Sequence, residues 1–209
     1  MQTVAPARLA SSLSEIAEAI AQCAAVGAAA VRVLPAPDCA ELAAAAHALP
    51  GWRAARPIVG EGDRQVFQDF ELTMQFPQSA PFRTVAQMID RALADAARQI
   101  QPNPLPAGFR INDLILQRYA AGSRGITPHR DHLRYRGLVA LLVVSGDGRF
   151  CLCADRRGVG ARDVAALPGD LLLMRAPGLA GSSDRPFHFL DRITAERLSF
   201  GLRWDTSVS

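Results

Sequence analysis

The spacing of apolar residues changes near the middle of this chain. Up to about residue 105, apolar positions recur at helical spacing in several stretches, as at Val85, Met88, Ile89 and Leu93. Such spacing is typical of amphipathic helices. From residue 109 onward, short apolar runs are separated by Gly, Pro and Asp turns, a pattern that favours β-strands. The pattern therefore predicts an α+β protein with a mainly β core.

Two or three helices and a few strands are predicted in the first half. Ser11 or Ser12 is placed to cap the first helix, because a Ser oxygen accepts a hydrogen bond from a free N–H group at a helix start. Asp38 is the expected N-cap of a second helix over residues 39–49, and a third helix covers residues 83–100. The strands expected in this half cover residues 31–34, 65–70 and 71–76.

The second half is predicted to be almost entirely β. Its expected strands cover residues 111–119, 126–131, 138–144, 149–154, 162–166, 171–175, 187–190 and 197–204. Many short strands at this spacing indicate a double-sheet sandwich or jelly roll. We expect residues 1–108 to pack on and complete a β core formed by residues 109–209, within one compact domain.

Composition limits the class of protein. The chain has 209 residues, of which 49% are hydrophobic and 21% charged, so it is able to bury a core. No apolar run approaches the roughly 18 residues that span a bilayer. Residues 1–13 lack a basic segment followed by an apolar one, so we expect no signal peptide, no membrane association and a cytoplasmic location. The net charge of +3 permits an anionic partner without requiring nucleic acid.

The four cysteines are interpreted as reduced, buried residues. Cys151 and Cys153 are two positions apart in an apolar segment and cannot pair easily in a regular strand, and Cys23 and Cys39 lie in predicted helical surroundings. A Cys-x-Cys metal site is the alternative, but the chain offers no second pair of cysteines to complete it.

Candidate chemistry begins with two of the four histidines. His129 and Asp131 are two residues apart, which places both side chains on one face of an extended strand. His188 lies further along the chain. Two histidines and one carboxylate are the ligands of a non-haem Fe(II) site that keeps open positions. We interpret His132 as an exposed neighbour and His47 as a packing or surface residue.

The last predicted strand alternates polar and apolar residues. Arg197, Ser199, Gly201 and Arg203 share one face, whereas the other face is apolar and is expected to pack against the core or the helices. A guanidinium group is a natural partner for a carboxylate. The polar face therefore predicts an anion site, with a solvent-exposed strand face as the alternative.

Taken in order, these motifs resemble a known superfamily. Gln117-Arg118-Tyr119-x-x-Gly122, His129-x-Asp131, His188 and Arg197-x-Ser199-x-x-x-Arg203 are similar to the Fe(II)/2-oxoglutarate-dependent dioxygenases, and most similar to their AlkB-like branch. The resemblance covers residues 109–205, about half of the chain. It implies a double-stranded β-helix, a kind of jelly roll, which agrees with the strand pattern.

The resemblance also implies roles for individual residues. His129, Asp131 and His188 would bind Fe(II), and Arg197 would pair with the distal carboxylate of 2-oxoglutarate. The remaining cosubstrate contacts that it implies are Tyr119, Ser199, Arg203 and Gln117. Arg203 would lie near the metal-chelating end, and Gln117 departs from the Asn that AlkB-like proteins often carry there. The implied reaction uses O₂ to convert 2-oxoglutarate into succinate and CO₂ while the substrate is hydroxylated, or demethylated at an N-methyl group.

The substrate stays open at this stage. Nucleic-acid demethylases stack an extruded base on aromatic side chains, but aromatic residues make up only 6% of this chain and form no clear basic-aromatic cluster. The sequence is therefore as consistent with a hydroxylase of an amino acid, a peptide or another small molecule as it is with a nucleic-acid demethylase. Arg130, Arg134 and Arg136 either orient an anionic substrate or are simply solvated. We expect residues 52–82 to form the pocket walls.

Two other classes of protein are weighed against the enzyme. One is a non-redox metal-binding protein of cupin type, and the other is a catalytically silent barrel that serves for interaction. The Arg197 and Arg203 face argues against the cupin-type reading, because a metal alone does not need two arginines beside it.

Overall fold

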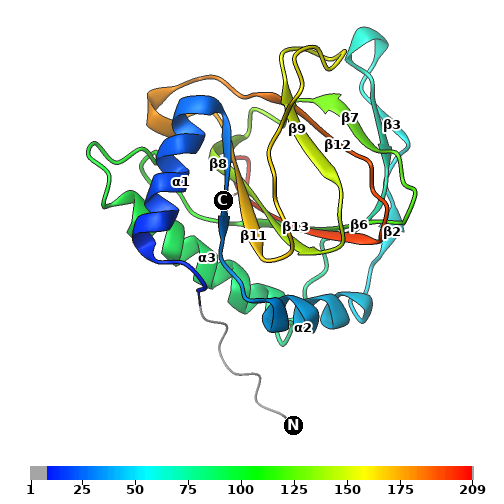
Figure 1. The fold of residues 1–209 in the computed structure, drawn as a ribbon, viewed down its shortest axis with the longest axis horizontal. Coiled ribbons are helices and arrows are strands. Elements are labelled where there is room, and N and C mark those ends of the chain that lie inside the picture. Colours follow the sequence, from blue (N-terminus) through cyan, green and yellow to red (C-terminus); the bar gives the residue numbers. More distant parts are fainter. Residues whose placement is uncertain (1–8, 209) are drawn as a thin grey trace.

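The computed structural model describes residues 9–208, in which two β-sheets face each other and three α-helices pack on the larger sheet (Figure 1). The helices are α1 (Leu13–Val26), α2 (Ala36–His47) and α3 (Pro81–Ala97). The larger sheet has the strand order β1-β11-β8-β13-β6-β5-β2, and the smaller sheet has the order β10-β9-β12-β7-β4-β3.

All strand pairs in both sheets are antiparallel. The larger sheet contains β1 (Ala28–Arg32), β2 (Arg53–Ala54), β5 (Glu71–Thr73), β6 (Asp113–Tyr119), β8 (Tyr135–Ser145), β11 (Asp170–Arg175) and β13 (Arg197–Asp205). The smaller sheet contains β3 (Ile58–Val59), β4 (Val66–Asp69), β7 (Gly125–His129), β9 (Arg149–Cys153), β10 (Arg162–Asp163) and β12 (Phe187–Asp191). Short 3-10 helices are η1 (Gly62–Arg64) and η2 (Leu179–Gly181). The predicted jelly roll with N-terminal helices packed on it is confirmed.

The first half of the chain contributes strands to both sheets. β1 pairs with β11 and β5 pairs with β6 in the larger sheet, while β4 pairs with β7 in the smaller one. Segments far apart in sequence are thus joined by backbone hydrogen bonds. The division of the chain at residue 108 and the assignment to one compact domain stay predictions.

The start of α1 follows the local sequence. The Ser12 side chain accepts a hydrogen bond from the Glu15 backbone, and the Glu15 carboxylate accepts one from the Ser12 N–H, which together form a capping box. Gly27, at φ 98°, ends the helix in the left-handed region that glycine adopts without strain. β1 then begins at Ala28 rather than at the predicted Val31, because its pairing with β11 starts there.

The second helix begins earlier than the sequence predicted. α2 starts at Ala36 with Pro35 as its N-cap, so the assignment of Asp38 as N-cap was wrong. Proline has no N–H group to leave unpaired, which allows the first turn to include Pro37. Asp38 lies in this first turn, where its carboxylate still interacts favourably with the helix dipole.

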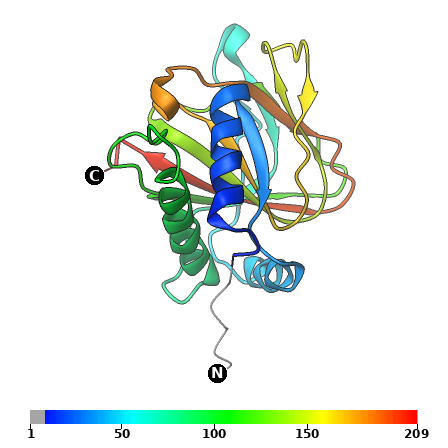
Figure 2. The ribbon, with the colours of Figure 1, turned by 60° about the vertical axis from the view of Figure 1, so that its left-hand side comes forward.

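The alternation along β13 positions the core and the site on opposite sides of one strand. Leu198, Phe200 and Leu202 are fully buried in the cluster formed with the three helices. The Phe200 ring lies 5.0 Å from the Phe82 ring of α3, measured between centroids, and each such buried side chain stabilises the fold by roughly 1.5–3 kcal/mol. Figure 2 shows α1 and α3 side by side on this face. The other face of β13 therefore points between the two sheets.

Three further predictions concerned membrane association, a signal peptide and cellular location. Within residues 9–208, no helix is long and apolar enough to cross a membrane. The expected lack of a signal peptide concerned residues 1–13, most of which lie outside the described residues. The cytoplasmic location stays a prediction.

Candidate metal centre and its cavity

Three side chains with metal-ligand atoms meet between neighbouring strands of the smaller sheet. His129 ends β7 and lies directly opposite His188 of β12 in the antiparallel register. Asp131 follows two residues after His129. The ligand atoms of the three residues all lie within 4.8 Å of one another, and His188 Nε2 is 3.8 Å from Asp131 Oδ2. Strand pairing thus brings together the three residues that the sequence pattern singled out, and we call them the triad.

The two imidazole rings are held so that one nitrogen of each is free for a ligand. His129 Nδ1 lies 2.9 Å from the Thr127 carbonyl oxygen, and His188 Nδ1 lies 3.3 Å from the Pro186 carbonyl oxygen. Because a carbonyl oxygen only accepts hydrogen bonds, Nδ1 must carry the proton in each ring. The unprotonated Nε2 then faces its neighbours, which is the arrangement found at metal-ligating histidines.

The electrostatic environment favours the protonation states that bind a metal. Burial lowers the pKa of His129 to about 4, with a further contribution from His188, so the ring is neutral at pH 7. Burial works against ionisation of Asp131, but the neighbouring His188 and His129 side chains and the Arg203 guanidinium outweigh it and hold the pKa of this carboxyl below its usual value. Neutral imidazoles and a carboxylate are the forms in which these side chains coordinate metals.

Arg197 provides a buried positive charge in the same cavity. Its side chain belongs to a residue that is only 2% exposed, and its Nε donates a hydrogen bond of 3.1 Å to Ser199 Oγ. Its Nη1 has no hydrogen-bond partner among the described residues. Burial lowers the pKa of Arg197, as expected for a cation removed from water. An unpaired buried guanidinium is costly, so this end of the cavity is suited to an anion.

Tyr119 lies beside this guanidinium. It occupies the position opposite Arg197 in the β6–β13 register, and it is 2% exposed. Burial raises the pKa of the Tyr119 hydroxyl, which therefore stays protonated and remains a hydrogen-bond donor. Tyr119, Ser199 and Arg197 thus line one end of the cavity, and Gln117 lies opposite Ser199 on the same pair of strands.

Arg203 differs from Arg197 although both lie on the same face of β13. Its Nη2 lies 2.7 Å from Asp113 Oδ2, and its guanidinium carbon lies 4.6 Å from the centroid of the Tyr135 ring. Its charge also contributes to the lowered pKa of Asp131. Arg203 therefore forms an ion pair and lies toward the triad, although its Nε has no hydrogen-bond partner among residues 9–208, whereas Arg197 forms no ion pair with any of these residues.

The triad and both arginines line one small cavity between the sheets, with a volume of about 70 Å³. Apolar side chains make up much of the remaining lining, and they include Val139 and Leu141 of β8, Phe150 of β9 and Met174 of β11. The predicted apolar strand around residues 138–144 thus faces the site. The sequence did not identify these lining residues one by one, because no local sequence pattern distinguishes an apolar residue that lines a cavity from one in the core.

A larger cleft of about 560 Å³ opens above the triad. Its lining includes Arg53, Gln68 and Met74, in agreement with the expectation that residues 52–82 form pocket walls. Arg64 of η1 also lines it and lies within that expected range, whereas Arg156 was missed because it comes from a loop far away in the sequence. We call this space the outer cleft.

The remaining histidines and the cysteines do not belong to the triad. His132 is exposed and belongs to the outer cleft wall, and His47 is an exposed residue of α2. All four cysteines are free, and among residues 9–208 the triad is the one group of His, Cys, Asp or Glu side chains close enough to hold a metal. Cys23, Cys39 and Cys151 are buried as predicted, whereas Cys153 is only partly buried, so the prediction was wrong for that residue.

Comparisons with known proteins relate the fold to solved structures. No protein-family model matches this sequence, and no curated protein matches it. A prolyl hydroxylase from Trichoplax adhaerens, solved in complex with a hypoxia inducible factor peptide fragment, has a TM-score of 0.66 and 11% identity over 94% of each chain. A prolyl-4-hydroxylase from Pseudomonas putida has a TM-score of 0.60 and 19% identity over 91% of this chain and 98% of that one.

A third structure is similar over most of its length. HygX from Streptomyces hygroscopicus, with nickel, 2-oxoglutarate and hygromycin B bound, has a TM-score of 0.59 and 15% identity over 91% of this chain and 87% of that one. At these identities the likeness shows a shared fold. The chain has the jelly-roll fold of 2-oxoglutarate and Fe(II) oxygenases, and its own triad lies between the sheets of that fold.

Proposed function

We propose that this protein is an Fe(II)- and 2-oxoglutarate-dependent dioxygenase, in which His129, Asp131 and His188 hold the metal and Arg197 holds the cosubstrate. The observation that carries the proposal is the unpaired, buried Nη1 of Arg197 in the same cavity as the triad. The donor set fits Fe(II), which two histidines and one carboxylate bind with open positions. The guanidinium fits the distal carboxylate of 2-oxoglutarate.

The roles of the side chains follow from their positions. When bound, Fe(II) supplies the redox chemistry by which O₂ and 2-oxoglutarate yield succinate, CO₂ and one oxygen atom inserted into a substrate C–H bond. Arg197 neutralises and orients the distal carboxylate, and Ser199 fixes the guanidinium through its 3.1 Å hydrogen bond. Tyr119 donates a hydrogen bond from its protonated hydroxyl to the same carboxylate. Arg203 places a positive charge beside Asp131 at the metal end of the cosubstrate.

The surroundings of the cavity protect the reaction from water. Val139, Leu141 and Met174 contribute apolar walls, and they offer no hydrogen bonds to solvent. Exclusion of water strengthens the Arg197–carboxylate interaction and limits side reactions of oxidising species. Gln117 lies at the wall of both the inner cavity and the outer cleft, where its amide is placed to contact cosubstrate or substrate.

We infer that hydroxylation of a peptide or small molecule is favoured over nucleic-acid demethylation. A flipped base needs an accessible aromatic face. In the outer cleft, the Phe70 ring packs against Tyr119 with centroids 5.0 Å apart, and Tyr135 is only 3% exposed. The AlkB-like placement stays a prediction. Structures that share this fold include prolyl hydroxylases and HygX, so peptides and small molecules form the first substrate panel.

Calorimetry with Mn(II), which does not drive turnover, tests the proposal directly. We expect 2-oxoglutarate to bind the Mn(II)-loaded protein, and succinate to form slowly from 2-oxoglutarate with Fe(II) and ascorbate even without substrate. The Arg98→Ala variant serves as the control for loss of an arginine outside the cavity, because Arg98 is exposed on the helical side with 67% of its side chain accessible. Absence of both 2-oxoglutarate binding and succinate formation in the wild-type protein would contradict the proposal and favour a non-redox metal protein.

A further inference from the structure

The lining of the outer cleft has an unusual charge balance. Six arginines contribute to it, namely Arg53, Arg64, Arg130, Arg134, Arg156 and Arg203. The one carboxylate in the lining is Asp131, which the proposed function assigns to the metal. A concave surface lined by charges of one sign concentrates the field and attracts ligands of the opposite sign.

Most of this positive charge is not neutralised by the protein itself. Arg203 is paired with Asp113, and Arg134 Nε lies 3.0 Å from Asp205 Oδ2. The other four arginines of the cleft form no ion pair with any residue between 9 and 208. The chain provides partners for other arginines, such as Arg149 with Asp191 at 2.6 Å. Arginines elsewhere, such as Arg56, Arg91 and Arg192, also form no ion pair with the described residues, but the four in the cleft line one concave space above the triad.

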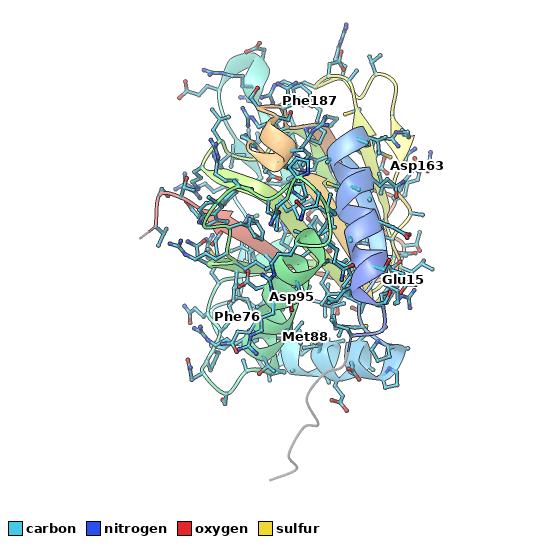
Figure 3. The ribbon with its side chains drawn as sticks, turned by 90° about the vertical axis from the view of Figure 1, so that its left-hand side faces the viewer. Glu15, Phe76, Met88, Asp95, Asp163 and Phe187 are labelled. Carbon is cyan, nitrogen blue, oxygen red and sulfur yellow. The ribbon has the colours of Figure 1, made fainter. Side chains whose placement is uncertain are left out.

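Three of these arginines gather from separate segments. The guanidinium carbons of Arg130 and Arg156 lie 4.1 Å and 5.6 Å from the centroid of the Phe187 ring. Arg156 Nη1 donates a hydrogen bond of 3.3 Å to the Arg64 carbonyl oxygen. Figure 3 shows Phe187 at the end of the molecule opposite α2. We call Arg64, Arg130 and Arg156 the arginine rim. All three line the same cleft, so their charges add to one positive field that an anion bound there would offset.

The floor of the cleft is apolar. Val66 and Leu72 are buried, Ile115 separates the cleft from the inner cavity, and Met74 is 51% exposed. An exposed methionine offers a flexible apolar contact for a ligand. A volume of about 560 Å³ lies in the range of sites that enclose small molecules.

We propose that the substrate of this enzyme is a small organic anion, whose carboxylate or phosphate group binds the arginine rim while its carbon chain lies over the apolar floor toward the triad. This inference rests on the proposed function, because it takes the triad as the point of hydroxylation. Bidentate hydrogen bonds from guanidinium groups suit carboxylates and phosphates alike. The same rim disfavours cationic substrates, because they would be repelled at the entrance.

Four matched six-carbon probes test the charge and the chain separately: hexanoate, hexyl phosphate, hexan-1-ol and hexylamine. Each is titrated calorimetrically into the full-length protein, both metal-free and loaded with Mn(II) and 2-oxoglutarate. We expect the two anions to bind at least about tenfold more tightly than the alcohol and the amine, since a hydrogen bond to a charged group carries at least that factor. Whichever of hexanoate and hexyl phosphate binds more tightly shows whether the substrate's anionic group is a carboxylate or a phosphate.

Charge reversal locates the binding. Arg64→Glu/Arg130→Glu is expected to weaken binding of the anionic probes at least about tenfold, and Arg64→Gln/Arg130→Gln is expected to weaken it less. Both arginines are exposed, so the variants are expected to fold. Arg157→Glu is the matched control, because Arg157 lies beside Arg156 but its side chain is 85% accessible and does not line the cleft. It should change probe binding less than about twofold.

The outcomes separate this inference from the proposed function. If 2-oxoglutarate fails to bind with Mn(II) while the anions still bind the metal-free protein at the rim, the proposed function fails and the anion site stands. If 2-oxoglutarate binds but the alcohol binds as well as the anions, or Arg157→Glu acts as strongly as the rim variants, the anion site is overturned. Binding of a ten-nucleotide oligothymidylate, with none of hexyl phosphate, would overturn the small-molecule assignment in favour of nucleic acid.

Discussion

β13 presents two faces that differ in chemistry although they alternate along the same nine residues. On the helix-facing side, Phe200 and its apolar neighbours are sealed against α3. On the cavity-facing side, Arg197 is equally buried but leaves a donor without a partner. One face gains stability from burial, whereas the other bears the cost of a desolvated charge.

This difference separates stability from function within a single strand. A buried unpaired cation weakens a fold, so its presence calls for a compensating ligand. In the account proposed above, the carboxylate of 2-oxoglutarate provides that compensation, and the helix-facing side supplies the stability that makes the cost tolerable. Substitutions on the two faces should therefore have different consequences, which the following variants are designed to expose.

The largest expected effect on stability comes from the helix-facing side. Phe200→Ala removes a fully buried ring that contacts Phe82 and Phe76, and it should destabilise the protein by about 3–5 kcal/mol. Urea unfolding measures this loss. The affinity of the remaining folded protein for 2-oxoglutarate should stay close to that of the wild type, and a large loss of affinity at unchanged stability would contradict the separation of the faces.

The second effect concerns metal binding by the triad, which lies across the cavity from Arg197 and the rest of this face of β13. His129→Ala should weaken Mn(II) binding by more than about 100-fold, because even residues that only orient a metal ligand contribute about 10–100-fold. Calorimetry or equilibrium dialysis measures it. His132→Ala is the matched control, since His132 is exposed and is not part of the triad. Equal losses in the two variants would argue against His129 as a ligand.

The pH dependence of the metal-free protein tests the neutral state of His129. Its pKa is lowered to about 4 in the folded protein, whereas an unfolded histidine titrates near 6.5. Between these values the unfolded chain binds more protons, so stability should fall by up to ~3 kcal/mol as the pH decreases from 6.5 to 4. Urea unfolding across this range checks it. His129→Gln should flatten this part of the profile, while His47→Gln, at an exposed site, should leave it unchanged.

A smaller effect is expected from Gly201, which lies on the cavity-facing side between Arg197 and Arg203. A Cβ atom there would lie 2.7 Å from Ile115 Cγ2, so the Ile115 side chain must shift. Gly201→Ala should destabilise the protein by about 1 kcal/mol. Thermal unfolding measures this change, and an increase in stability would contradict the close packing of Gly201 against Ile115.

The sequence predicted the inner part of the site better than the outer part. His129 and Arg197 lie on β7 and β13, where side chains alternate between the two faces, and His188 pairs with His129 in an antiparallel ladder that carries a register shift after His188. Asp131 lies two residues beyond the end of β7, so the predicted strand over residues 126–131 was too long. The apolar side of β13 was predicted for the same reason. These features depend on strand geometry, which a short stretch of sequence already specifies.

The outer cleft depends on relations that a linear pattern does not contain. Arg64 ends η1, which follows the edge strand β3, and Arg156 lies in the loop after β9. The Arg156 side chain nevertheless donates a hydrogen bond to the Arg64 backbone carbonyl oxygen. The register of β4 against β7 and the course of the loops decide this contact. Helix boundaries also shifted, as at Asp38, because proline at a helix start competes with a polar cap.

The central claim is that Arg197 is kept unpaired for a cosubstrate carboxylate, and thermal unfolding of Arg197→Met tests it most directly. Methionine keeps much of the side-chain volume without the charge. The metal-free variant should be more stable than the wild type, because it no longer buries a charge without a carboxylate partner, and 2-oxoglutarate with Mn(II) should no longer stabilise it. Arg203→Met is the matched control on the same face. It should destabilise the protein, because it leaves Asp113 buried without its partner. A destabilised Arg197→Met protein that 2-oxoglutarate still stabilises would contradict the account.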